Sequence, residues 1–526
     1  VQLLMNQAFG TPLQGVPTGP LELGSSDSES MASSPDDGGF VMVFPDPSTC
    51  PVPLSSDNTK VGLTAAKCME SSDVGEDTSS TNSAEQQEQM TRLSEERKVY
   101  VRRVSSRMYH RVRSTSTTPS AFPHLFQCIL LVGLNLDSGD KKVKVPYIKT
   151  KYPLDADVPP HIEHLCFPDA KDWPPPVSNT SSVTGASSID EQSYSLVITS
   201  ETGGRRFGYC RRVLPEGSNI CLPLAYCIIS PFRASGFYYK ILAELESRHG
   251  QPEWLQAAFI KELYSCQFPA PGQGLRLSTA NTSYNTAGPV CSMVTTVVRR
   301  PLDSRLEERD LTQLFSALPV PVLLQLFGSL LLERKVILIS NSLSRLSSCV
   351  EALQSILYPF SWQHTLIPVL PTSLLDICLS PTPYIVGILR GRDASAIPGP
   401  IDESLMIDLD EARILQGVGD EASILPTRLR RCLKVALQLV TNTTQPRDAS
   451  RNVLISEAFV RMFVEVCGHY RNHIVTQQDG LKVFEKESFI KAVTSQSMRL
   501  FLEWFTETAM FCAFMESHLE VESDVR

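Results

Sequence analysis

KVILISNSLSRLSSCVEALQSILYPFSWQHTLIPVLP, residues 335–371, contains a strand, a helix and a second strand in direct succession. KVILIS is short and almost wholly apolar, as a buried strand requires. SLSRLSSCVEALQSILY has helical spacing, and Asn341 or Ser342 is placed to cap that helix. TLIPVLP follows as the next strand, in which Pro368 demands an edge position or a bulge. This order predicts a βαβ unit and hence a parallel sheet covered by helices.

The flanking sequence extends this α/β pattern in both directions. Two helices are expected before it, over DLTQLFSALP and VPVLLQLFGSLLLE, where apolar residues recur every three or four positions. TPYIVGIL (382–389) and SLMIDLD (404–410) predict two further strands. After Leu425 the sequence predicts helices only.

The region before residue 233 predicts a separate small α+β module. LFQCILLVGLNL, which starts at Leu125, has the continuous apolarity of a buried strand. SYSLVITS and RRFGYCRRVL (193–214) alternate around a glycine-containing turn and predict a hairpin. NICLPLAYCIISPF (219–232) predicts a third strand, and a helix over FYYKILAELESRHG should stop at Gly250.

Charge and cysteine content limit the functional classes. The net charge is -9, and residues 1–90 carry thirteen acidic residues against two lysines, so the remainder sums to about +2. Bulk charge therefore gives no case for nucleic-acid binding. Fourteen cysteines without a C-x-x-C pair favour a reducing, cytosolic compartment over a disulfide scaffold. The longest apolar stretch, 320–339, is interrupted by charged residues and does not predict a membrane span.

The N-terminal region changes character near residue 96. Residues 1–95 are acidic and rich in Ser and Pro, which predicts a disordered tail. Residues 96–120 form a basic linker, where ERKVYVRRVSSRMYHRVR places one apolar stripe beside Arg103, Arg107 and Arg111. Three readings stay open: a helix on an anionic membrane, a clip that folds back onto the tail or the domain, and a solvated linker helix.

A search for catalytic and metal-binding patterns finds little. The sequence has no G-x-x-x-x-G-K-[ST] loop, no G-x-G-x-x-G after a strand and no G-x-S-x-G elbow. HIEHLC brings together His161, His164 and Cys166, but no second ligand pair follows at a zinc spacing. Asp408 and Asp410 share one side of a strand and either bind Mg²⁺ or cap the strand end. We predict no metal, no cofactor and no covalent catalysis.

Several strings, in order along residues 121–520, resemble the DENN-domain family and most closely its type 2 subfamily. They are CFPDAKDW (166–173), FGYCRRVLP (207–215), RPLDSRLE (300–307), SLLLERKVILIS (329–340), LSRLSSC (343–349), LYPFSWQHTLIPVLP (357–371), SPTPYIVGIL (380–389) and SEAFVRMFVEVCGHY (456–470). The resemblance implies a longin-like upstream module, a central α/β module and a helical downstream part. The residue pattern divides the chain accordingly at 121–233, 234–389 and 390–526.

The resemblance also implies a function: guanine nucleotide exchange on a Rab-family small GTPase in membrane trafficking. Such a protein works in the cytoplasm, with peripheral contact to endosomal, Golgi or vesicle membranes. The alternative is a non-exchanging scaffold that binds a Rab or a cytoskeletal partner. A hydrolase of unrecognised type is the third hypothesis.

Contact residues for the GTPase follow from two arguments. Ligands of open α/β sheets gather at the carboxyl ends of the strands, which favours Asn341, Ser342 and Arg390. Trp362 and His364 are the second group, because interfaces favour Trp. Core packing is the preferred account of Trp362 and of the nearby aromatic residues Tyr358 and Phe360.

Overall fold

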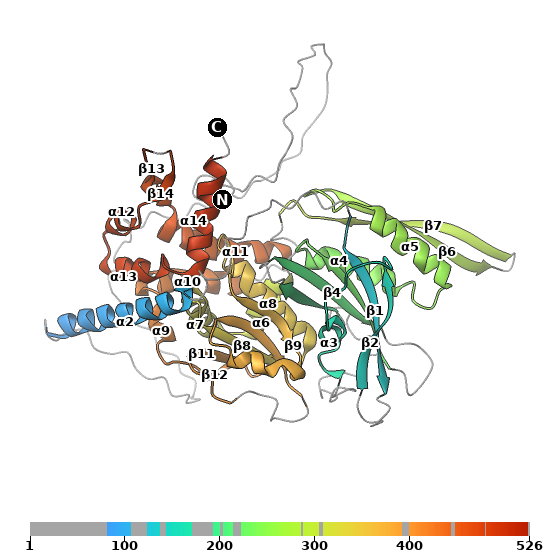
Figure 1. Ribbon diagram of the computed structural model, residues 1–526, viewed down its shortest axis with the longest axis horizontal. Coiled ribbons are helices and arrows are strands. Elements are labelled where there is room, and N and C mark those ends of the chain that lie inside the picture. The colour runs from blue at the N-terminus through green and yellow to red at the C-terminus, as the bar shows by residue number, and fades with distance from the viewer. Residues whose placement is uncertain are drawn as a thin grey trace, which may run out of the picture. The chain divides into compact units, whose positions relative to one another are not determined.

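The computed structural model describes residues 81–106, 124–136, 144–170, 193–199, 204–213, 222–285, 288–303, 309–391, 399–442, 448–478 and 480–523. Residues from Gln86 onward belong to one unit, and the fold below is that of this unit. Two five-stranded sheets organise it (Figure 1).

The first sheet is antiparallel, with the strand order β2-β1-β5-β4-β3. Its strands are β1 (Cys128–Leu136), β2 (Lys144–Tyr152), β3 (Ser193–Thr199), β4 (Arg205–Val213) and β5 (Leu224–Ser230). The predicted β1, the β3–β4 hairpin and β5 are confirmed. The edge strand β2 was not predicted, because KVPYIKTKY is largely polar and only one of its residues is fully buried.

Both faces of this sheet are covered. One face packs on α4 (Ser235–Glu246), in a cluster that includes Tyr209, Ile228 and Phe237. The other face packs on the short helix α3 (Ile162–Cys166). Gly250 has a φ of 85°, the left-handed conformation that glycine adopts readily, four residues after α4 ends. The predicted helix and its stop are confirmed.

A helix and a long hairpin follow that the sequence analysis did not predict. They are α5 (Glu253–Ser265), β6 (Gly274–Asn285) and β7 (Gly288–Arg299), and the two strands pair only with each other among the described residues. Leu277 and Val298 are nevertheless buried against the cluster that holds α4.

The second sheet has the order β12-β11-β8-β10-β9. Four of its strands, β11, β8, β10 and β9, are parallel, as the βαβ pattern predicted. Its members are β8 (Lys335–Ser340), β9 (Thr365–Leu370), β10 (Tyr384–Leu389), β11 (Ser404–Asp408) and the antiparallel β12 (Arg413–Gln416). Because β11 pairs directly with β8, this sheet continues past residue 389, where the sequence analysis ended the central module.

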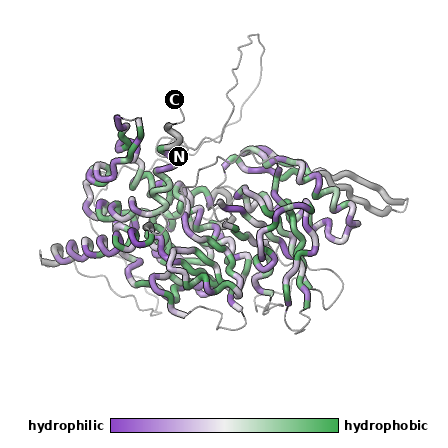
Figure 2. Tube along the Cα trace, viewed as in Figure 1, coloured by the Kyte–Doolittle hydropathy of each residue, from purple (hydrophilic) through white to green (hydrophobic). Residues whose placement is uncertain are grey.

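Helices cover both faces of this sheet. One face packs on α6 (Arg309–Ala317), α7 (Val320–Leu331) and α8 (Leu343–Ile356). The opposite face packs on the 3-10 helix η4 (Thr372–Leu379). Figure 2 shows hydrophobic residues concentrated in the central strands and helices. Pro368 lies in the edge strand β9, where the register shifts, so both predicted conditions for a proline are met.

The downstream part is mainly helical, as predicted, but it also contains one small hairpin, where the sequence analysis expected helices only. Its elements are α9 (Glu421–Ile424), α10 (Thr427–Asn442), α11 (Asp448–Cys467), η6 (Tyr470–His473), β13 (Ile474–Thr476), β14 (Lys482–Phe484), α12 (Lys486–Lys491), α13 (Gln496–Phe505) and α14 (Ala509–Ser523). Its apolar side chains share one continuous core with the central sheet.

The predicted disordered tail is wrong for residues 81–95. The helix α2 (Thr81–Ser106) includes them, and the rest of the predicted tail lies outside the described residues. The segment is rich in Glu, Gln and Arg, which are good helix formers, and Ser94 and Arg97 are buried by docking onto later elements. Composition alone does not reveal that docking. No helix in the described part of the chain combines the length and apolarity needed to cross a bilayer.

Candidate functional site

The carboxyl ends of the parallel strands gather polar side chains at one edge of the second sheet. Asn341 and Ser342 follow β8, and Arg390 follows β10. The backbone N–H of Arg390 donates to the Ser340 carbonyl at 2.9 Å. The three residues predicted from the strand-end argument therefore lie together, at what we call the strand-end site: Asn341, Ser342, Arg345, Arg390, Asp408 and Asp410.

Asp410 holds the loop after β8 in place. Its carboxylate accepts from the Ser340 hydroxyl at 2.9 Å and from the Asn341 backbone N–H at 2.7 Å. The guanidinium of Arg345 donates to the same carboxylate at 2.8 Å. Ser342, rather than Asn341, caps α8, because its hydroxyl accepts from the Arg345 backbone N–H.

Asp408 is buried, with its carboxylate enclosed by donors. It accepts from the backbone N–H groups of Asp410 and Glu411 at 2.9 and 3.0 Å and forms an ion pair with Arg390. Since each of the two aspartates already faces a guanidinium and backbone donors, the site favours strand-end capping over Mg²⁺ binding.

The strand-end site exposes polar side chains at the surface. Asn341 is exposed, and the side chains of Arg345 and Arg390 are 45% and 28% exposed. Arginine is enriched at protein interfaces because its planar guanidinium binds carboxylates and backbone carbonyls in defined geometry. The sequence analysis missed Arg345, although its place three residues after the Ser342 cap is the signal that could have found it.

Trp362 and His364 do not lie on an exposed rim. Trp362 is 1% exposed, and its indole N–H donates to the Thr365 carbonyl at 3.1 Å. The His364 ring is equally enclosed and lies 3.2 Å from the carboxylate of Glu333. Arg205 of β4 donates to the carbonyls of both residues, at 2.7 and 2.9 Å. The contact hypothesis for these two residues is corrected: they join the first sheet to the second.

The aromatic residues before them divide between core and surface. Phe360 is buried, with its ring centroid 4.9 Å from that of Phe463. Tyr358 is 43% exposed, so its predicted core position is wrong. It follows α8 at the turn where the chain leaves the helix.

Of the three basic candidates, only Arg103 lies within the described residues. It forms an ion pair with Glu403 and stays 48% exposed. Arg107 and Arg111 lie outside the described residues. For its described part, α2 folds back onto the domain, which was one of the three open readings.

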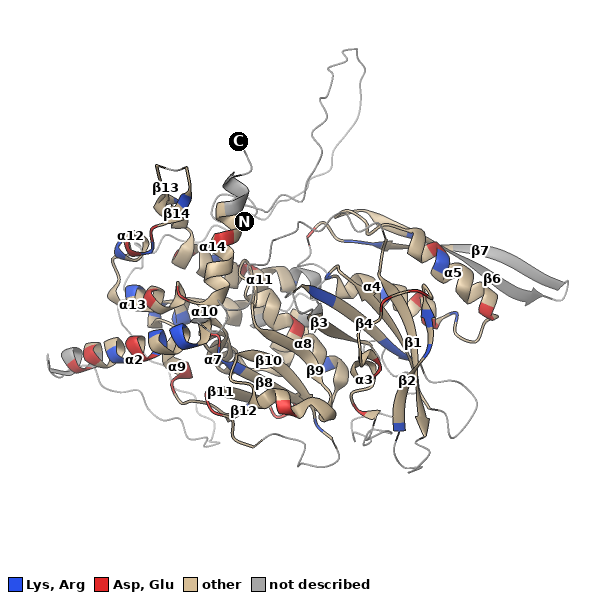
Figure 3. Cartoon of the chain, in the orientation of Figure 1, with Lys and Arg blue, Asp and Glu red and all other residues tan. Residues whose placement is uncertain are grey.

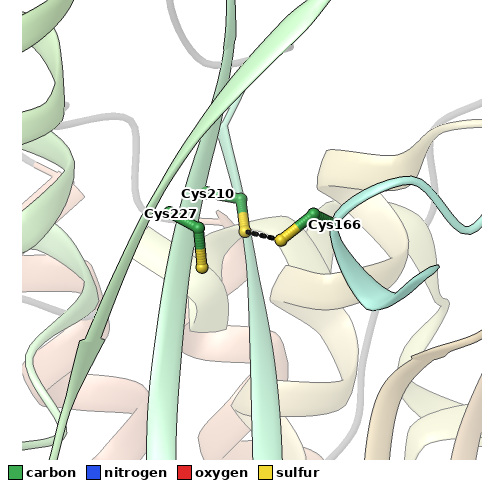
Figure 4. A group of neighbouring side chains, drawn as sticks. All are labelled: Cys166, Cys210 and Cys227. Atoms are coloured by element: carbon green, nitrogen blue, oxygen red, sulfur yellow. Dashed lines mark hydrogen bonds between the residues drawn. The ribbon is translucent and has the colours of Figure 1, made fainter. Parts of the chain in front are cut away.

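Three buried thiols meet on one face of the first sheet (Figure 4). Cys210 and Cys227 are cross-strand partners, and the Cys210 sulfur lies 3.9 Å from that of Cys166 in α3. Hydrogen bonds from the other two thiols lower the pKa of Cys166, whereas desolvation raises the pKa of Cys210. Burial among apolar neighbours makes this cluster part of the core.

The structure separates the residues of HIEHLC. His161 and His164 group with Glu163 at the surface, whereas Cys166 turns into the core to meet Cys210. His161, His164 and the Cys166 thiol therefore do not form one metal-ligand set.

Comparisons with known proteins match three consecutive domains. The uDENN domain matches residues 146–213, the DENN (AEX-3) domain residues 221–412, and the dDENN domain residues 484–526. The first two include most of the first sheet and the whole of the parallel strands β8 to β11.

Curated relatives carry the same domain in their names. The chain is 42% identical over 363 residues to human DENN domain-containing protein 2B and 41% identical over 370 residues to human DENN domain-containing protein 2C. These matches cover 68% and 69% of this chain but only 30% and 38% of the relatives, so the chain spans about a third of their length. Human DENN domain-containing protein 2D is 36% identical over 352 residues, which is 67% of this chain and 71% of that relative. The chain belongs to the DENN-domain family and is related to its type 2 members.

Proposed function

We propose that this chain is a guanine nucleotide exchange factor for a Rab-family GTPase. The ordered succession of uDENN, DENN and dDENN matches supports the proposal. In this reading the first sheet and its helices form a longin-like module, and the second sheet and the downstream helices form the rest of the exchange unit.

Exchange needs a surface that holds a distorted GTPase, and it breaks no covalent bond. A factor that binds the nucleotide-free GTPase more tightly than the GDP-bound form weakens GDP binding by the same ratio. Displaced switch segments, which otherwise contact the nucleotide and Mg²⁺, are the parts that such a surface stabilises. Cellular GTP then fills the empty site.

The strand-end site is our candidate for part of that surface. It presents two arginines and an exposed asparagine on a rigid support, because Asp408 and Asp410 fix the loops from both sides. Preorganised polar groups lose little conformational entropy on binding, which favours specific recognition. The proposal includes the location: cytoplasmic, with peripheral contact to endosomal, Golgi or vesicle membranes.

The direct test is the rate of fluorescent GDP release from a panel of Rab proteins, with and without the full chain. At least one Rab is expected to release GDP faster. Acceleration of none would refute the exchange activity, and equal affinity for the GDP-bound and nucleotide-free forms would support the scaffold alternative.

Asn341→Ala tests the location of the surface without disturbing the fold. The hydrogen bond from this residue to Asp410 comes from its backbone N–H, which alanine retains. An exposed interface contact contributes about 1 kcal/mol, so exchange should slow by roughly fivefold. Gln477→Ala is the matched control, because Gln477 is an exposed amide beside the β13–β14 hairpin. Equal rates for both variants would remove Asn341 from the proposed surface.

A further inference from the structure

The helix α2 docks onto the domain along one face. Val101 and Val104 are 1% and 4% exposed. The hydroxyl of Ser94 donates to the Leu500 carbonyl at 2.8 Å, and that of Ser105 donates to the Glu507 carbonyl at 2.9 Å. The docking contacts therefore run along the second half of α2, from Ser94 to Ser105.

Charge pairs reinforce this docking. Figure 3 shows alternating basic and acidic residues along α2. Arg97 binds Asp420 at 3.0 Å, and Arg102 binds the Glu507 carboxylate at 2.7 Å. Desolvation would raise the pKa of Glu507, but hydrogen bonds from Arg102 and Lys486 outweigh it and lower that pKa. The carboxylate is therefore charged at neutral pH.

The end of α2 contains a kinase recognition pattern. Arg102, Arg103, Val104 and Ser105 read R-R-x-S, in which two guanidinium groups two and three residues before a serine can bind acidic side chains of an arginine-directed kinase. Ser105 is next to the last residue of the helix and is 7% exposed. We propose that Ser105 is a phosphorylation site and that its modification releases the end of α2 from the domain.

The reaction is ordinary phosphoryl transfer from ATP. The Ser105 Oγ forms a bond to the γ-phosphorus, the bond from that phosphorus to the bridging oxygen breaks, the hydroxyl proton passes to solvent and ADP leaves. Because the docked serine is enclosed and Arg102 is engaged by Glu507, only the undocked helix is a substrate.

The product cannot return to the docked position. A phosphoserine carries a charge of about -2 near neutral pH, and Glu507 lies beside it. The helix C-terminus is the negative end of the helix dipole, which adds to the repulsion. Lys486 and Arg102, 2.6 and 2.7 Å from the Glu507 carboxylate, are the cations that oppose this effect. The enclosed hydroxyl nevertheless leaves no space for a phosphate, and phosphorylation removes the proton that Ser105 donates to the Glu507 carbonyl.

The experiment treats the full chain with the catalytic subunit of an arginine-directed serine kinase and ATP. Mass spectrometry locates the phosphate, and hydrogen exchange measures α2. We expect phosphate at Ser105 and at least a tenfold loss of exchange protection over residues 97–105. Ser105→Ala should show neither change. Phosphate only at Ser106 or elsewhere, or unchanged protection in the phosphorylated chain, overturns the proposal.

A second pair of variants tests whether docking hides the site. Arg97→Gln removes the pair with Asp420 eight residues before Ser105, outside the recognition pattern, so it should raise the phosphorylation rate about tenfold. Arg92→Gln is the control on the same helix, since Arg92 is 71% exposed and pairs with Glu96 of α2 itself. Equal rates for the two variants overturn the occlusion. None of these measurements depends on exchange activity.

Discussion

Replacing Glu333 with alanine should loosen the start of α14. Glu333 lies between α7 and β8, is 1% exposed, and reaches across to the first residues of that downstream helix. Its carboxylate accepts from the backbone N–H groups of Ala509 and Met510 at 3.0 and 2.8 Å. These are among the four N–H groups that a helix leaves without intrahelical partners.

The magnitude follows from the two hydrogen bonds. A hydrogen bond to a charged group contributes about 1.5–3 kcal/mol, so losing both costs about 3 kcal/mol at the low end. Burial of the carboxylate offsets part of the upper range. Glu333 has a φ of 54°, the left-handed region that strains any side chain. Alanine has the same strain, so Glu333→Ala reports the carboxylate alone.

Hydrogen exchange of a peptide covering 505–516 measures the opening of α14 directly. A loss of about 3 kcal/mol corresponds to roughly a hundredfold faster exchange. Glu333→Gln keeps only one of the two oxygen acceptors, because its amide N–H2 group faces the second backbone N–H as a donor. It should therefore lose one of the two hydrogen bonds and cost about 2 kcal/mol. A change below threefold in the alanine variant, or equal effects in the two variants, would refute this account of the cap.

Gly387→Ala should destabilise the second sheet and lower the melting temperature, because a Cβ at this position would lie 2.1 Å from the backbone oxygen of Pro368. Gly399→Ala is the control and should leave the melting temperature unchanged, because nothing lies within 4 Å of a Cβ there. Acidification should undock α2. Desolvation would raise the pKa of Asp420, but hydrogen bonds from Arg334 and Arg97 outweigh it and lower that pKa. The stabilisation of the docked helix by the Asp420 carboxylate is therefore present above the ordinary pKa of 3.8 and is lost as the pH falls through the lowered pKa. Hydrogen exchange along α2 at a series of pH values from neutral to below 4 should show this loss, and constant protection would contradict it.

The central sheet was predictable because its strands are buried on both faces. KVILIS and TPYIVGIL are continuous apolar runs, and such runs of strand length between helices fit only a parallel sheet with two covered faces. The strand-end argument also placed Asn341 and Arg390 correctly at one edge of that sheet, while their contact with a GTPase stays a prediction. In a parallel sheet all carboxyl ends meet at one edge, whatever the connections are.

Other features depend on contacts that are far apart in the sequence. Trp362 and Phe360 follow the same helix as the exposed Tyr358, and no local pattern separates them. Phe360 packs on side chains more than a hundred residues later, such as Phe463. The hairpin β6–β7 escaped prediction for a related reason, since β6 carries few apolar residues and the two strands pair with each other.

The shared core also bears on how the family's domains act together. The Phe360 ring, from the connection between α8 and β9, has its centroid 4.8 Å from that of Phe514 and 5.4 Å from that of Phe505. Both partners lie in the segment that matches the dDENN domain, whereas Phe360 lies in the DENN match. Burying an aromatic side chain contributes about 2–3 kcal/mol, so the two parts stabilise each other. A surface built on the strand ends of the central sheet therefore rests on the downstream helices as well, and a change that loosens those helices reaches the proposed GTPase contact through the core.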